Sequence, residues 1–136
     1  METHTGKCLC GEVTYEVSGD PVLQGNCHCI DCRKNTGAGF ATILFFKEEQ
    51  VAQLRGKTSS FQYKSDSGNS KTKLFCQRCG SVVLGNNSGR PGIMSVYVGT
   101  LDDASFVTPQ FNVYISRALP FVKIDESLNN FEEGRQ

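Results

Sequence analysis

Apolar and polar residues alternate along several short segments of this chain. The clearest of these segments is Glu12–Ser18. Its residues Val13, Tyr15 and Val17 fall on one face, whereas the residues between them are polar. Alternation of this kind is typical of a strand with one buried face. Phe40–Phe46 is instead almost continuously apolar, which predicts a buried strand.

Further strands are predicted where β-branched and aromatic residues collect between clusters of Gly, Asn, Ser and Pro. They span residues 22–26, 58–64, 71–75, 81–84, 93–98 and 111–115. One short helix is predicted at Ile30–Asn35, ended by Gly37 and Gly39. Many short strands with little helix predict an all-β fold. The chain from Asp125 onward is polar, and we expect it to be frayed, apart from Leu128 and Phe131.

Length and charge narrow the classes of function. A chain of 136 residues predicts a single domain, residues 1–136, with an ordered core from about 6 to 125. Its 14 basic and 14 acidic residues give no net charge, which argues against a nucleic-acid partner because phosphate contacts need a basic face. No apolar run approaches the roughly 20 residues of a membrane span. The segment Met1–Lys7 is polar, unlike a secretory signal, so we expect a cytoplasmic protein without a membrane partner.

Cysteine is the unusual feature of the composition. There are seven, an odd number that intramolecular disulfides cannot fully pair. Their spacings are C-x-C and C-x-x-C, and a glycine follows both Cys10 and Cys79. Thiolates two or three residues apart can converge on one ion, about 2.3 Å from each sulfur, as in tetrahedral zinc sites. The spacing therefore indicates metal binding.

Seven ligands divide naturally into four and three. The spacing favours one site built from the first and last pairs, namely Cys8, Cys10, Cys76 and Cys79. The remaining three lie within six residues and form a second site: Cys27, Cys29 and Cys32. Four protein ligands close a structural site, whereas three leave one position for water or substrate.

Three alternatives stay open at this point. A zinc ribbon could use Cys29, Cys32, Cys76 and Cys79, although the gap between its pairs exceeds the usual spacing of about 15–20 residues. Buried free cysteines behave as small hydrophobes and need no metal. A thioredoxin-like redox pair would belong beside a βαβ unit, which the strand pattern does not indicate.

Four ordered motifs resemble the glutathione-dependent formaldehyde-activating enzyme family. They are Gly6–Val13 (GKCLCGEV), Cys27–Arg33 (CHCIDCR), Phe75–Gly80 (FCQRCG) and Val98–Asp103 (VGTLDD). The resemblance extends over nearly the whole chain. It implies an Mss4-like fold, in which several short coiled antiparallel sheets bind zinc at their turns.

The resemblance also implies two zinc ions per chain. A structural zinc would lie on Cys8, Cys10, Cys76 and Cys79, and a catalytic zinc, less securely held, on Cys27, Cys29 and Cys32. The implied activity is that of a zinc-dependent carbon–sulfur lyase, similar to S-hydroxymethylglutathione synthase. Its partners would be a small thiol such as glutathione and an aldehyde such as formaldehyde.

Other residues near these motifs have predicted roles. Glutathione carries two carboxylates, so we expect a cation near the second site, and Arg33 directly follows its third ligand. His28 should point away from its two cysteine neighbours rather than bind the metal. The chain departs from many family members at Asn112, where they have histidine, and at Phe121, where they have tryptophan.

A different class of function is a non-catalytic, zinc-stabilised β-scaffold that binds a protein partner. Fold alone does not separate these classes, because function lies in the site. The three-cysteine site favours the enzyme, since a scaffold needs no incomplete second metal site.

Overall fold

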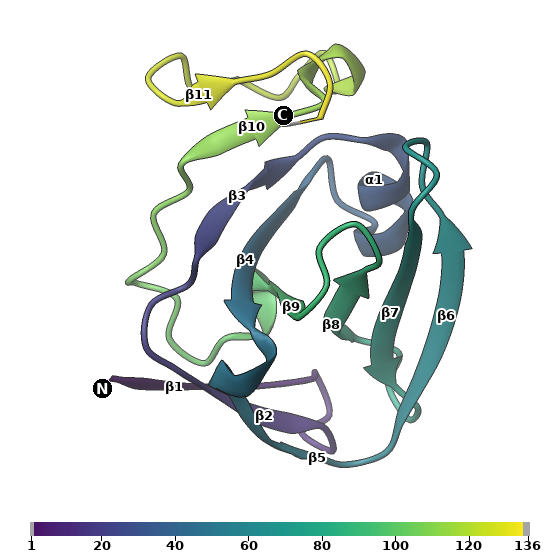
Figure 1. Ribbon diagram of the computed structural model, residues 1–136, viewed down its shortest axis with the longest axis vertical. Coiled ribbons are helices and arrows are strands. Elements are labelled where there is room, and N and C mark those ends of the chain that lie inside the picture. The colour runs from purple at the N-terminus through teal and green to yellow at the C-terminus, as the bar shows by residue number, and fades with distance from the viewer. Residues whose placement is uncertain (1, 135–136) are drawn as a thin grey trace.

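Two β-sheets form this protein, in a computed structural model that describes residues 2–134. The smaller sheet has the strand order β1-β2-β5, and the larger has the order β11-β10-β3-β4-β9-β8-β7-β6 (Figure 1). The strands are β1 (Thr3–Lys7), β2 (Thr14–Ser18), β3 (Leu23–Cys27), β4 (Ala41–Lys47), β5 (Val51–Arg55), β6 (Thr58–Lys64), β7 (Ser70–Cys76), β8 (Val82–Asn87), β9 (Ile93–Tyr97), β10 (Phe111–Val113) and β11 (Asn129–Asn130).

Helix is sparse within the described residues. The α-helix α1 (Ile30–Thr36) is joined by three single 3-10 turns: η1 (Glu48–Gln50), η2 (Val98–Thr100) and η3 (Ile115–Arg117). None of the helices in residues 2–134 has the length and apolar character to cross a membrane. The prediction of an all-β fold with little helix is confirmed.

Most strand pairs are antiparallel, but β10 is parallel to both of its neighbours, β3 and β11. The structure differs here from the sequence expectation, because the chain beyond Asp125 is not frayed throughout. The pair Asn129–Asn130 forms β11, and the amide of Phe131 donates to the carbonyl of Asn112 over 2.9 Å. Backbone hydrogen bonds hold this polar segment in place without an apolar pattern in its sequence.

The main core lies where β2 of the smaller sheet packs against β4, β8 and β9 of the larger one. The alternating face predicted for β2 is buried, with Val13, Tyr15 and Val17 no more than 1 % exposed. Strand β4 is a buried strand, as predicted, and the structure shows that both of its faces are covered. Its Leu44 and Phe46 enter this core, whereas its other face borders a separate, smaller apolar cluster.

The larger sheet is strongly coiled. In Figure 1 the β6–β7 hairpin curves round so that its upper end lies beside α1. The hairpin and the helix α1 line the same cavity, to which the hairpin contributes Lys71 and the helix contributes Cys32. Strand β3 lines the same cavity as β6 and β7, although these strands are far apart in the order of the sheet.

Gly25 allows β10 to pack closely against β3 at the wall of the cavity. It lies on β3 two residues before Cys27, and the ring of Phe111 from β10 packs directly over it. A Cβ atom at this position would lie 2.5 Å from two atoms of that ring, far inside van der Waals contact.

We expect Gly25→Ala to lower the free energy of unfolding by about 1–3 kcal/mol, because the extra methyl group overpacks β3 against β10. Urea unfolding of the metal-loaded protein measures the change. Gly99→Ala is the matched control, since a Cβ there meets nothing within 4 Å. Its effect should stay within about 0.5 kcal/mol. Equal stability of the two variants would contradict the close approach.

Candidate functional site

Four cysteine sulfurs converge where two distant turns meet beside the main core. Each lies within 4.8 Å of the others, and the residues are Cys8, Cys10, Cys76 and Cys79. The first pair lies between β1 and β2, and the second at the end of β7 and the turn that follows. The Sγ atoms of Cys8 and Cys10 are 3.6 Å apart, and those of Cys10 and Cys76 are 3.7 Å apart. Tetrahedral ligands about 2.3 Å from a zinc ion would be separated by about 3.8 Å, so this cluster fits such an ion.

Glycine makes both turns possible. Gly11 follows Cys10 with φ of 84°, and Gly80 follows Cys79 with φ of 80°. Residues with a side chain rarely adopt this left-handed conformation. The two glycines bring the chain round directly behind the second ligand of each pair, as the sequence pattern suggested.

Backbone amides point at the buried sulfurs of this cluster. The amide of Val13 donates to Cys8 Sγ over 3.2 Å. The amides of Arg78 and Cys79 donate to Cys76 Sγ over 3.3 and 3.4 Å. Such donors favour the thiolate over the thiol, and thiolate is the form that binds metal.

A serine hydroxyl joins the two turns. The amide of Leu9 donates to Ser81 Oγ over 3.0 Å, and Ser81 Oγ lies 3.2 Å from Cys79 Sγ. Because the serine oxygen accepts from Leu9, its own proton is available to the cysteine sulfur. Hydrogen bonding to Ser81 lowers the pKa of Cys79 to about 5.

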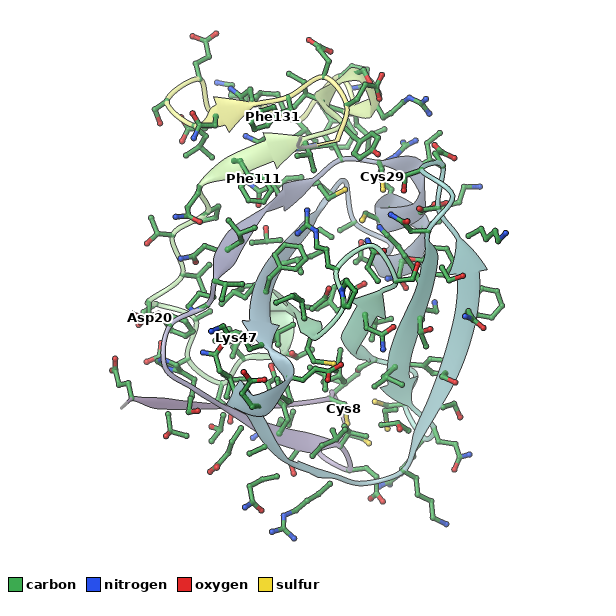
Figure 2. The ribbon with its side chains drawn as sticks, viewed as in Figure 1. Cys8, Asp20, Cys29, Lys47, Phe111 and Phe131 are labelled. Atoms are coloured by element: carbon green, nitrogen blue, oxygen red, sulfur yellow. The ribbon has the colours of Figure 1, made fainter. Side chains whose placement is uncertain are left out.

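The second cluster comprises Cys27, Cys29 and Cys32, whose sulfurs also lie within 4.8 Å of one another. Cys27 ends β3, and Cys29 is the N-cap of α1. The amide of Cys32 in the first turn of the helix donates to Cys29 Sγ over 3.2 Å. The first turn of α1 therefore holds the sulfurs of Cys29 and Cys32 close together. Figure 2 shows yellow sulfur atoms near Cys8 and, separately, near Cys29.

The structure thus brings together the two groups of cysteines that the spacing favoured. The alternative zinc ribbon is not formed, because its four cysteines are divided between the two clusters. All seven cysteines are free thiols in the structure.

Hydrogen bonds among the three thiols of the second cluster shift their pKa values in opposite directions. Hydrogen bonds from Cys27 and Cys32 lower the pKa of Cys29 to about 2. Hydrogen bonding to Cys29 raises the pKa of Cys27 to about 11. Hydrogen bonding to Cys27 and Cys29, together with burial, raises the pKa of Cys32. Three thiolates would need a cation among them, which a metal ion supplies.

His28 lies outside the group of converging ligand atoms. Its side chain is buried, and its Nε2 lies 3.0 Å from Asn112 Oδ1. The other end of that amide, Asn112 Nδ2, donates to Asn130 Oδ1 over 2.9 Å. Asn112 Oδ1 therefore accepts from His28. The chain His28–Asn112–Asn130 ties the cysteine turn to β10 and β11.

A cavity of about 470 Å³ opens at the three-cysteine cluster, and all three cysteines line it. Two cations, Lys71 and Arg90, also line it. Further polar groups come from Asp31 and Asp66 and from three tyrosines: Tyr63, Tyr97 and Tyr114. The chemistry available in this cavity is therefore that of thiols beside cations and hydroxyl groups.

Arg33, the substrate residue predicted from the sequence, lies on α1 and is half-buried. It is not among the residues that line the cavity, and its Nε has no hydrogen-bond partner within residues 2–134. Sequence reasoning missed Lys71 and Tyr97, which do line the cavity. Both lie in strands far from the cysteine motif, and only the coiling of the sheet brings them to it.

Comparison with known proteins agrees with this geometry. Residues 3–117, which include all seven cysteines, match the sequence profile of a family described as "Glutathione-dependent formaldehyde-activating enzyme". A solved structure of a protein from Rhodobacter sphaeroides is similar in fold, with a TM-score of 0.58 and 23% sequence identity. The match covers 77% of this chain and 91% of that chain. The fold is accordingly Mss4-like. The chain belongs to the glutathione-dependent formaldehyde-activating enzyme family.

Proposed function

We propose that this protein is a zinc-dependent carbon–sulfur lyase that forms or cleaves S-hydroxymethylglutathione. One observation carries the proposal: a cluster of three cysteines, one ligand short of a closed tetrahedral site, opens into a cavity large enough for a small molecule. Membership of the family supports glutathione and formaldehyde as the substrates. We place the protein in the cytoplasm, where such thiols stay reduced.

The two clusters have different roles in this proposal. The four-cysteine cluster would hold a structural zinc, because protein ligands fill every tetrahedral position. Cys27, Cys29 and Cys32 would hold a catalytic zinc and leave one position facing the cavity. Held by these three cysteines, a zinc ion would supply the positive charge that favours the thiolate form of an incoming thiol at neutral pH.

Tyr97 is the residue best placed to act on the aldehyde. It lines the cavity and, like Cys27 and Cys29, packs against the smaller apolar cluster that contains Cys32. Its hydroxyl oxygen accepts a hydrogen bond from Asn35 Nδ2 over 2.8 Å, which leaves the hydroxyl proton to donate. Burial raises the pKa of Tyr97, so the proton is retained. In the proposal this proton binds the aldehyde oxygen, where negative charge develops as the sulfur attacks the carbon.

Arg33 stays a predicted substrate residue. It lies on α1, is half-buried and does not line the cavity. Its side chain would therefore have to change conformation to contact a substrate. The cavity wall offers other cations in more direct positions.

The second candidate function is the non-catalytic scaffold. Leu9, at the tip of the first cysteine turn, is 87% exposed, but a single exposed apolar side chain is common on protein surfaces and gives this function little support. The scaffold does not need the cavity at the three-cysteine cluster. Titration of the bound zinc with glutathione separates the two, because only the enzyme has a zinc that responds to thiols.

We expect two zinc ions per wild-type chain and about one in Cys32→Ser, because that change removes a ligand from the three-cysteine cluster alone. Elemental analysis after gel filtration gives the ratio. Cys76→Ser removes a ligand from the cluster within the main core, so this variant should fail to fold stably. Retention of two zinc ions by Cys32→Ser would contradict the proposed ligand set.

We expect the wild-type protein to speed the exchange between glutathione plus formaldehyde and their adduct, measured by exchange NMR. Cys32→Ser should abolish this acceleration, because the incoming thiol loses its binding position. Gly99→Ala, at a position that does not line the cavity, serves as the control and should retain it. Turnover that survives in Cys32→Ser would refute the mechanism.

We expect Tyr97→Phe to slow the same exchange by about 10²–10³-fold, the usual effect of removing one donor to a developing oxyanion. Its zinc content should be that of the wild type, because Tyr97 is not a ligand. Unchanged turnover would remove Tyr97 from the mechanism without affecting the proposed metal sites.

A further inference from the structure

Lys71 is an ammonium group set into the wall of the cavity. It lies on β7, where its backbone pairs with Tyr63 of β6 on one side and with Asn87 of β8 on the other. Its position inside the sheet fixes its backbone, and its half-buried side chain lines the same cavity as the three cysteines.

The groups that face Lys71 do not neutralise it. Within residues 2–134 it forms no ion pair with a carboxylate, although Asp31 and Asp66 also line the cavity. A lysine ammonium is protonated at neutral pH, and this one lines the same cavity as the three-cysteine cluster. Because its side chain is only half-buried, the charge is accessible to a ligand that enters the cavity.

We propose that Lys71 binds a carboxylate of the thiol substrate, so that the cavity selects carboxylate-bearing thiols over neutral ones. This inference rests on the proposed function, because it assumes that the substrate sulfur sits at the three-cysteine cluster. A thiol held there has its remaining atoms in the cavity, against the wall that carries Lys71. In glutathione a carboxylate lies on each side of the cysteine residue, so one of them can face this wall.

The other charges of the cavity agree with a substrate of this class. Arg90 adds a second positive charge, with its guanidinium 4.7 Å from the centre of the Phe45 ring. Asp31 and Asp66 contribute two negative charges. Two cations with two carboxylates complement a tripeptide thiol that carries two carboxylates and one ammonium group. A neutral thiol would offer no carboxylate to Lys71.

Lys73 provides a matched control on the same strand. It is two residues from Lys71 and is also half-buried, but its ammonium lies near the rings of Phe61 and Phe75 rather than in the cavity. Replacing either lysine with methionine removes one positive charge from β7. Only Lys71→Met removes it from the cavity.

The test measures binding of two probes to the zinc-loaded protein by titration calorimetry. The probes are glutathione and glutathione diethyl ester, which share the thiol but differ in their carboxylates. We expect the wild type to bind glutathione more tightly than the ester. Lys71→Met should weaken glutathione binding by about 10- to 100-fold, the usual effect of losing a charged hydrogen bond, and leave ester binding within about threefold.

The remaining variants complete the comparison. Lys73→Met should keep the wild-type preference for glutathione, and Lys71→Arg should restore most of it, because the charge is retained. Equal weakening of both probes in Lys71→Met would overturn the inference, since Lys71 would then act only on the charge of the thiolates. No change with either probe would overturn it as well. Failure of the wild type to bind any thiol would instead refute the proposed function, and this inference with it.

Discussion

The meeting of two cysteine turns is the constraint on which the rest of the structure depends. Cys10 and Cys76 are 66 residues apart in the chain, yet their sulfurs are 3.7 Å apart. One turn extends from the three-stranded sheet and the other from the eight-stranded sheet, so the cluster joins the two. Cys8 and Cys76 are also members of the main apolar core. Closing so long a loop is entropically unfavourable, and an ion bound by all four sulfurs would offset that loss.

Strand β4 connects this clamp to the functional site. On one face, Leu44 and Phe46 fill the core that the four-cysteine cluster borders. On the other face, Ile43 and Phe45 line the cavity that opens at the second cluster. A single buried strand thus contributes both to the core beside the four-cysteine cluster and to the wall of the cavity at the three-cysteine cluster. This dual use explains why Phe40–Phe46 is the most apolar stretch of the sequence.

Local sequence patterns predicted the parts of the structure that local physics decides. The alternating face of β2, the buried β4 and the grouping of the cysteines all follow from residue type and spacing. The strands β1 and β5 were not predicted, because they flank β2 in the smaller sheet and carry few buried apolar residues. β11 was missed for a similar reason, since both of its residues are exposed. Strands of this kind are held by backbone pairing, which leaves little trace in the hydrophobic pattern.

The cavity could be predicted only in part. Its cysteines follow from their motif, but Lys71 and Tyr97 reach it through the curvature of the sheet, which no short segment encodes. Lys71 and Lys73 lie two residues apart on β7 and look equivalent in the sequence pattern. Only the fold shows that Lys71 lines the cavity and Lys73 does not. Arg33 is adjacent to the motif in sequence and yet lies outside the lining.

The hydrogen bonds from His28 to Asn112 and from Asn112 to Asn130 set an order in which the site can mature during protein synthesis. Asn112 is 84 residues beyond His28, and Asn130 lies a further 18 residues along the chain. The ribosome therefore makes the cysteine turn long before the residues that brace it. Until those residues emerge, Cys27 and Cys29 belong to a nascent chain whose turn lacks its partners.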